Sequence, residues 1–443
     1  MRHTKLIAAA LVLLAGATVR ADTVDVSSTT LVTGGQQTRF TGGTKLDLVT
    51  VVPAYEILSV VARDVTNPVA SDLQLVLAGW GAYDFDHLRW DNGTSSNLNG
   101  DLQMGYVQGK LLNRQLTLRI GREQVQTGVA RMIHIDGGEA IVLLPAGFRV
   151  SGYVGAPVSQ RFQSRSGLRS WNPEGGDLAY GGRLAYSLPI PGVPGRGLDI
   201  GASANFVEDG GDPVRQEVGG DLRLQPIGNL TLLAFGAYSL YDDRFSEASV
   251  MGTWTPIHKL HLSADWHFFA PDLFLARNSV LSVFSASDRN EFGGGLTYEL
   301  GRGLSVGADY HLQLEPGATE ESGHHIGHDA NARLDWSRGA TVAGAEFLFL
   351  DALENGYWGG RLYGRQSFGK LFAAADVIGH VFREKVNNET YAVTGTLSAG
   401  LELARGFSAV ISGRAGVTPF LEQTYDVMAK LVYNQTYVRR EVR

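Results

Sequence analysis

Polar and apolar residues alternate with a period of two along much of this chain, as they do in a β-strand with two chemically different faces. The stretch KLHLSADWHFF, residues 259–269, is a clear case, because every second residue is apolar. The polar positions between them are His261, Ser263, Asp265 and His267. This stretch therefore predicts a strand with one apolar and one polar face.

The same alternation returns many times from residue 177 onward. Segments of about ten residues follow one another with short gaps, and each places apolar side chains on one face. The clearest segments are residues 178–186, 198–206, 214–224, 304–313, 329–336, 391–399, 407–415 and 425–433. The sequence thus predicts consecutive antiparallel hairpins.

The connections between these segments alternate in length. Short turns are expected at 226–229, 256–259, 301–303, 337–339, 368–370 and 404–406, and longer polar connections at 156–176, 271–289, 315–325, 350–356, 381–388 and 418–424. Short turns at one end and long loops at the other are typical of a transmembrane antiparallel up-and-down β-barrel. A soluble sandwich has no reason to sort its loops in this way.

The pattern predicts an all-β barrel of about 18 strands, with a range of 16 to 20, over residues 46–443. About 14 strands follow residue 177, and residues 46–155 add four to six. Alternation is blurred over 46–64 and 131–148, and the second stretch also fits a loop folded inward. Residues 22–45 are rich in Thr, Ser and Gly and are expected to form a periplasmic lead.

The N-terminus indicates export. Arg2 and Lys5 precede an apolar run and a small-residue stretch ending at Ala21, which predicts a signal peptide over residues 1–21. The chain has 38 Lys and Arg against 45 Asp and Glu, and the signal peptide removes three basic residues and no acidic ones. An acidic mature chain argues against a nucleic-acid partner.

No stretch has the roughly 20 consecutive apolar residues of a membrane-spanning helix, and no cysteine is present. The expected location is the outer membrane of a Gram-negative bacterium, in contact with its lipid.

In such a barrel the polar face of each strand lines the interior. The Ser, Asp and His residues of 259–269 also suggest a catalytic or metal site, but four alternate residues span roughly 20 Å and cannot share one centre. The expected interior charges have both signs: Arg119, Glu217, Asp221, Arg223, Asp265, Asp309, Arg333, Asp335, Arg361, Arg365 and Arg414.

A second cluster of candidate chemistry is EESGHHIGHD, residues 320–329. Three His within 324–328 are the residue type that binds transition metals, but the setting favours an exposed polar loop. No hydrolase, metalloprotease or phosphate-binding motif stands out. We therefore predict no metal, no cofactor and no enzymatic activity.

Two stretches resemble outer-membrane polysaccharide exporters of the alginate-export type, and more closely the barrel partners of periplasmic polysaccharide-export proteins in myxobacteria. They are LTLRIGREQVQTGVARMIHIDGGEA, residues 116–140, and residues 264–300. The resemblance implies an 18-stranded barrel with an Arg-rich interior that conducts a sugar polymer outward. It carries Arg119, Arg122 and Arg131 over as interior positions. Acidic residues are as common as basic ones in the expected lining, which argues against a strongly anionic polymer.

The predicted function is an outer-membrane pore for a secreted polysaccharide, working with a separate periplasmic export protein. A general or nutrient-uptake porin is the alternative, and it predicts a trimer with a constricting inward loop. A barrel enzyme is a third possibility and requires Ser and His on neighbouring strands, for instance near His267 and His311. The residues expected to line the pore and contact the cargo are Arg119, Arg122, Arg131, Arg223, Asp265, His267, Arg333, Arg361, Arg365 and Arg414.

Overall fold

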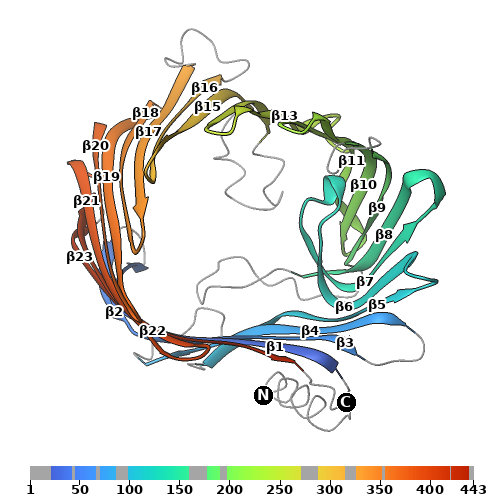
Figure 1. The fold of residues 1–443 in the computed structure, drawn as a ribbon, viewed down its shortest axis with the longest axis horizontal. Coiled ribbons are helices and arrows are strands. Elements are labelled where there is room, and N and C mark those ends of the chain that lie inside the picture. The colour runs from blue at the N-terminus through green and yellow to red at the C-terminus, as the bar shows by residue number, and fades with distance from the viewer. Residues whose placement is uncertain are drawn as a thin grey trace.

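The computed structural model describes residues 21–41, 45–65, 70–85, 98–158, 177–189, 197–270, 288–314, 326–351, 355–419 and 421–438. Residues 1–20 of the predicted signal peptide lie outside these residues, as do His324 and His325. The described chain folds into one antiparallel sheet that closes into a ring, as Figure 1 shows. In the described residues no helix is long and apolar enough to cross a membrane.

The sheet is an up-and-down meander in which each strand pairs with the next. The strands are β1 (Ala21–Thr41), β2 (Lys45–Val51), β3 (Pro53–Val65), β4 (Ser71–Asp84), β5 (Leu98–Leu111), β6 (Leu116–Val125), β7 (Ile133–Leu143), β8 (Phe148–Pro157), β9 (Leu178–Pro189), β10 (Gly197–Asp209), β11 (Asp212–Ile227), β12 (Leu230–Ser239), β13 (Arg244–Ile257), β14 (Leu260–Phe269), β15 (Arg289–Gly301), β16 (Leu304–Leu314), β17 (Ile326–Arg338), β18 (Thr341–Asp351), β19 (Gly356–Phe368), β20 (Leu371–Val386), β21 (Glu389–Ala404), β22 (Phe407–Thr418) and β23 (Leu421–Val438). Two 3₁₀ turns interrupt the meander, η1 (Gly128–Ala130) and η2 (Pro145–Gly147).

The barrel has 22 strands, because β2 and β3 are two parts of one strand. Both pair with β1 in a single register, with Gly35 opposite Val51 and Val32 opposite Ala54. The ring closes where β1 pairs with β23, from Thr23 opposite Val438 to Gly35 opposite Asp426. The prediction of an antiparallel barrel is confirmed, and the predicted count of about 18 strands is wrong.

Most of the strands missing from the predicted count lie in the N-terminal third. Of residues 22–45, predicted to be a periplasmic lead, residues 22–41 belong to β1 and Lys45 begins β2. Residues 131–148, which showed blurred alternation, contain strand β7, and the inward-folded segment lies just before it. Residues 45–157 hold six strands, within the four to six expected there, so the count falls short because β1 was not recognised, the lower end of that range was used, and fifteen strands rather than about 14 follow residue 177.

The two ends of the barrel differ. The turn end carries Ala21, Val438 and the tight turns at 228–229, 258–259, 302–303, 339–340, 369–370 and 405–406, as predicted. Left-handed backbone at Gly301, Arg302 and Gly303 makes one of these turns possible. The opposite, loop end carries the connections 85–97, 126–132, 158–177, 270–288 and 315–325. Connections at 381–388 and 418–424 were expected to be long, but β20 and β21 meet at the two-residue turn 387–388, and Thr418 pairs with Leu421.

Candidate functional site

The inner face of the wall is identified by following ladder partners from strand to strand, because directly opposite residues project from the same face. One such row is polar over most of its length and contains Arg119, Glu139, Tyr153, Gly181, Asn205, Glu217 and Ser239. Alternate residues form the apolar outer face, where large side chains such as Leu362, Leu397 and Ile411 are 65%, 70% and 57% exposed. The wall therefore has a polar inside and an apolar outside.

Residues 126–132, which we call the inner segment, fold into the barrel between β6 and β7. Figure 1 shows them inside the ring beside β10 and β11. The η1 turn packs on the inner faces of β9, β10 and β11. Val129 is fully buried, and its backbone N–H donates to the Ser203 hydroxyl at 3.0 Å. Gly128 has φ of 49°, and a Cβ there would lie 2.1 Å from Ser203 Oγ. The tight fit requires glycine at this position.

The inner segment covers an apolar patch on an otherwise polar wall. The buried residues of this patch are Val125, Ala130, Ile135, Tyr153, Ala179 and Val207. Apolar side chains on the inner face are compatible with a wet interior only if something covers them. The segment is therefore packed against the wall rather than free in the passage.

Arg131 ties the end of the inner segment to strands that lie far away in the sequence. Its guanidinium donates to Glu247 on β13 at 2.7 Å and to Glu217 on β11 at 2.9 Å. The Glu217 side chain is only 5% exposed. The Arg131 guanidinium also lies 5.7 Å from the centre of the Phe235 ring. A charge-assisted pair with a buried carboxylate is strong, so Arg131 acts as a clamp.

Other interior cations are also matched by carboxylates. Arg119 donates to Gln108 at 2.6 Å and to Glu139 at 2.9 Å. Further pairs, at distances up to 3.9 Å, link Arg183 to Asp199 and Asp221, Asp265 to His311, His267 to Glu247, Arg333 to Asp335, Arg361 to Glu346 and Asp376, and Arg414 to Asp426. Pairing of this kind leaves many polar groups but little net field across the interior.

Arg223 and Arg365 differ from these residues. Within the described residues, neither has a carboxylate oxygen within salt-bridge distance. The Arg365 guanidinium lies 4.2 Å from the centre of the Phe372 ring, which is a cation–π contact. Both residues sit near the turn end of the barrel. Their free donors make them the interior cations best placed to bind a passing solute.

Arg122 is misplaced by the sequence prediction. The ladders of β6 with β5 and β7 run without a register shift, so Arg122, three residues from Arg119, projects from the outer face. There it forms a bidentate pair with Asp136, at 2.6 and 2.7 Å. The remaining predicted residues, from Arg119 to Arg414, belong to the inner face or, for Arg131, to the inner segment.

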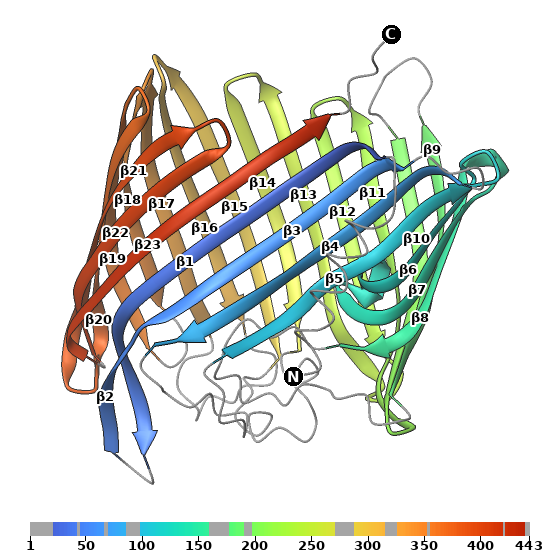
Figure 2. The ribbon, with the colours of Figure 1, turned by 90° about the horizontal axis from the view of Figure 1, so that it is seen from below.

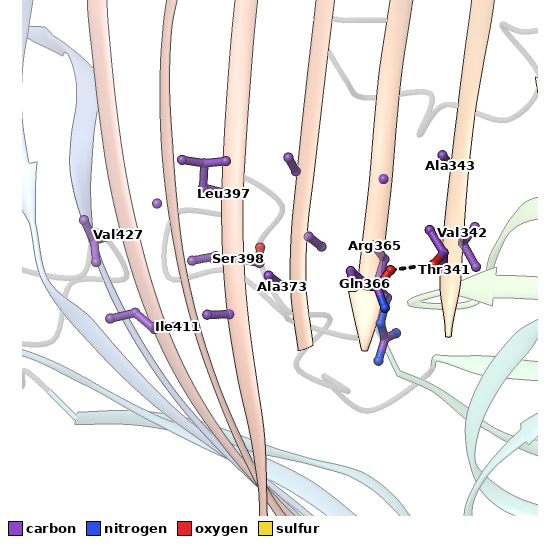
Figure 3. Close-up of a pocket in the computed structure, with 16 residues that line it drawn as sticks. Thr341, Val342, Ala343, Arg365, Gln366, Ala373, Leu397, Ser398, Ile411 and Val427 are labelled. Atoms are coloured by element: carbon purple, nitrogen blue, oxygen red, sulfur yellow. Dashed lines mark hydrogen bonds between the residues drawn. The ribbon is translucent and has the colours of Figure 1, made fainter. Parts of the chain in front are cut away.

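A catalytic or metal centre finds no support in the described part of the chain. His267 and His311 contact carboxylates, and no described serine hydroxyl is hydrogen-bonded to either ring. The described residues contain no group of three or more potential metal ligands. A shallow hollow of about 720 Å³ lies across β18–β23, and Figure 3 shows Leu397, Ile411 and Val427 beside it. These three side chains belong to the outer face, so this hollow is part of the lipid-facing wall.

Comparison with known proteins addresses the fold. No protein-family model matches the chain, and no curated protein sequence is significantly similar to it. Among solved structures, the ferric enterobactin receptor PfeA of Pseudomonas aeruginosa has a TM-score of 0.54 at 10% identity, covering 95% of this chain and 82% of that one. The fold is that of an outer-membrane β-barrel.

Two further structures are similar over nearly their whole length. The translocation pore of the P pilus usher PapC has a TM-score of 0.48 at 9% identity, and the matched region covers 94% of this chain and 100% of that one. OccAB4 of Acinetobacter baumannii has a TM-score of 0.46 at 9% identity, with 95% and 99% coverage. At these identities the likeness concerns the fold alone.

Proposed function

We propose that this chain is an outer-membrane channel through which a hydrophilic polymer, a secreted polysaccharide, leaves the cell. The observation that carries the proposal is the 22-stranded wall. A ring of that size has a backbone diameter of about 40 Å, from strand spacing and tilt. No connection between described strands is long enough to hold a plug domain, the longest being 158–177 and 270–288. A wide, polar passage suits a chain-like cargo better than a small nutrient.

The chemistry of the lining favours a neutral or weakly charged sugar polymer. Most interior cations are paired with carboxylates, so the wall offers both hydrogen-bond donors and hydrogen-bond acceptors without a strong electrostatic field. Arg365 over Phe372 and Arg361 over Tyr363 add flat cation–aromatic surfaces. Guanidinium planes and aromatic rings both stack on sugar faces. The proposed partner is a separate periplasmic export protein at the turn end.

The inner segment favours the alternative function, a nutrient-uptake porin, because a segment clamped against the interior wall narrows the passage. Small-solute selection needs such a constriction, whereas polymer export requires only that the segment leave a continuous path. The two functions therefore differ in what blocks the pore.

Planar-bilayer recordings test the proposal. Purified protein is titrated with neutral and acidic oligosaccharides of increasing length, added at either side. For a polymer pore, blocking affinity rises with chain length, and Arg365→Ala weakens it about tenfold, the loss of one charge-assisted contact. Arg414→Ala is the matched control, since its guanidinium is already bound to Asp426. A block that does not depend on length would contradict polymer transport and favour the porin. A deletion strain that keeps its surface polysaccharide would refute export directly.

A further inference from the structure

Aromatic side chains on the inner face of the barrel are gathered on two adjacent strands. Ladder pairing identifies the inner-facing residues of β15–β18, β21–β23 and residues 23–35 of β1, and none of those described is Phe, Tyr or Trp. On β19 and β20 the inner face carries Tyr357, Tyr363, Phe372 and Phe382. The aromatic residues that anchor a barrel in the membrane lie on its outer face. These four rings therefore require another role.

Two of these rings lie across a glycine on the neighbouring strand. Tyr363 is opposite Gly344 on β18, and Phe372 is opposite Gly400 on β21. A Cβ built on either glycine would overlap the ring opposite to it, so each ring occupies the space that a side chain would otherwise fill. One face of the ring is then against the wall, and the other face is directed toward the passage.

A guanidinium group lies over each of these two rings. Arg365 Cζ is 4.2 Å from the centre of the Phe372 ring, and Arg361 Cζ is 5.0 Å from the centre of the Tyr363 ring. Arg361 is also hydrogen-bonded to Asp376 at 2.9 Å, so its charge is compensated. The result is two flat surfaces with N–H donors along their edges. Such surfaces fit a sugar ring, which has a flat apolar face and a rim of hydroxyl groups.

The same column of rings continues to the loop end of the barrel. Tyr357 is directly opposite Phe382, with ring centres 6.5 Å apart, and it meets the His380 ring edge to face at 4.7 Å. Tyr357 and Arg365 are eight residues apart on one strand, which is roughly 26 Å. β19 and β20 run from one end of the wall to the other, as Figure 2 shows. We call the following inner-facing residues the aromatic track: Tyr357, Tyr363, Arg365, Phe372, His380 and Phe382.

The aromatic track lies across the barrel from the inner segment. Figure 1 shows β19 and β20 on one side of the ring and the inner segment on the other side, beside β10 and β11. The track therefore borders the part of the passage that the inner segment does not occupy. Beside the track, β21 places Thr394, Thr396 and Ser398 opposite inner-facing residues of β20. Their hydroxyl groups both donate and accept hydrogen bonds and carry no charge.

We propose that the aromatic track is the binding path of a single neutral or weakly charged sugar chain, which passes along β19 and β20 in an extended form. This inference rests on the proposed function and adds where in the passage the cargo binds. Stacking uses the face of a sugar ring rather than particular hydroxyl groups, so the chain moves from one flat surface to the next without a deep energy minimum. Because the track lies on one wall, it holds one chain at a time.

Block of single channels by dextran fragments of graded length tests the track. Tyr357→Leu, at the loop end, should weaken block by long fragments about fivefold to tenfold, which corresponds to one lost stacking contact. Block by short fragments should change less, because they still bind at Arg365 and Phe372 near the turn end. Tyr106→Leu is the matched control, since Tyr106 faces the interior from β5 and lies 6.0 Å from the Arg119 guanidinium, away from the track. Its block should equal that of the wild-type chain.

The possible outcomes separate the track from the proposed function. Migration of the unheated barrel on gels shows that each variant is folded. Block that rises with fragment length but is equally strong in a folded Tyr357→Leu chain would overturn the track and leave the polymer pore standing. An equal loss of block in Tyr106→Leu would also overturn the track, because sugar contacts would then surround the passage. If neither dextran nor acidic pectin fragments block the wild-type channel, the track and the polymer pore both fail.

Discussion

Replacing Arg131 by alanine should release the inner segment from the wall. In the wild-type chain the guanidinium bridges Glu217 and Glu247, and removing it leaves a carboxylate that is 5% exposed without its cation. Breaking a buried pair in this way costs about 3–5 kcal/mol. Arg131 is itself 23% exposed to the polar interior, so we take about 2–3 kcal/mol, which raises the open population about 30- to 150-fold.

Thiol labelling measures this change directly. Val129→Cys puts a reporter at a position with no exposure in the closed state, and the natural chain has no competing cysteine. Its labelling rate should rise by the same 30- to 150-fold in the Arg131→Ala background, and single-channel conductance should increase. Arg119→Ala is the control, since it removes an equally buried pair, with Glu139, that does not hold the segment. Labelling that is equally slow in both backgrounds would show that Arg131 is not the clamp.

Three further predictions concern single positions. Gly128→Ala should reproduce the labelling and conductance changes of Arg131→Ala without altering any charge, because a Cβ at this position clashes with Ser203 and φ is positive. A labelling rate equal to that of the wild-type chain would contradict the packing of the inner segment on the wall. Leu397→Lys should destabilise the barrel in the membrane by about 2–4 kcal/mol, measured as a smaller fraction of chain that migrates as folded barrel on unheated gels. Thr396→Lys faces the interior and should assemble normally. Equal defects in the two variants would mean that the two faces are misassigned. Phe372→Leu should weaken the block by oligosaccharides as Arg365→Ala does, because both variants remove the same stacked surface. An effect confined to Arg365→Ala would indicate a purely ionic contact.

The C-terminal two thirds of the barrel were readable from sequence because each strand there sorts its residues cleanly between lipid and water. The N-terminal part breaks that rule in two physical ways. On β1, hydroxyl residues occupy both faces, so Ser27 to Thr30 show no alternation. On β7, Ile135 faces inward under the inner segment while Asp136 faces outward, which reverses the usual order of polar and apolar positions. Packing by a segment inside the barrel is not visible in a two-residue period.

The candidate interior was predicted well at the level of strand faces and poorly at the level of partners. Arg361 and Asp376 are hydrogen-bonded because β19 and β20 are adjacent, which sequence order implies. Arg131 and Glu247 are 116 residues apart, and nothing in the sequence joins them. The error at Arg122 was avoidable, since residues three apart on one strand project from opposite faces. The polar contact of Glu56 with Ser28 and Thr30 was missed because β1 was not recognised as a strand.

The closing ladder between β1 and β23 joins the first and last strands of the wall, beginning with Thr23 opposite Val438. Every other ladder forms between strands that are neighbours in the chain, but this one has to wait for the whole polypeptide. A product truncated before β23 has two unpaired edges, and hydrocarbon offers no partner for their N–H and C=O groups. A stable barrel in the bilayer therefore requires β23, the last strand to be synthesised, because only its pairing with β1 removes both free edges.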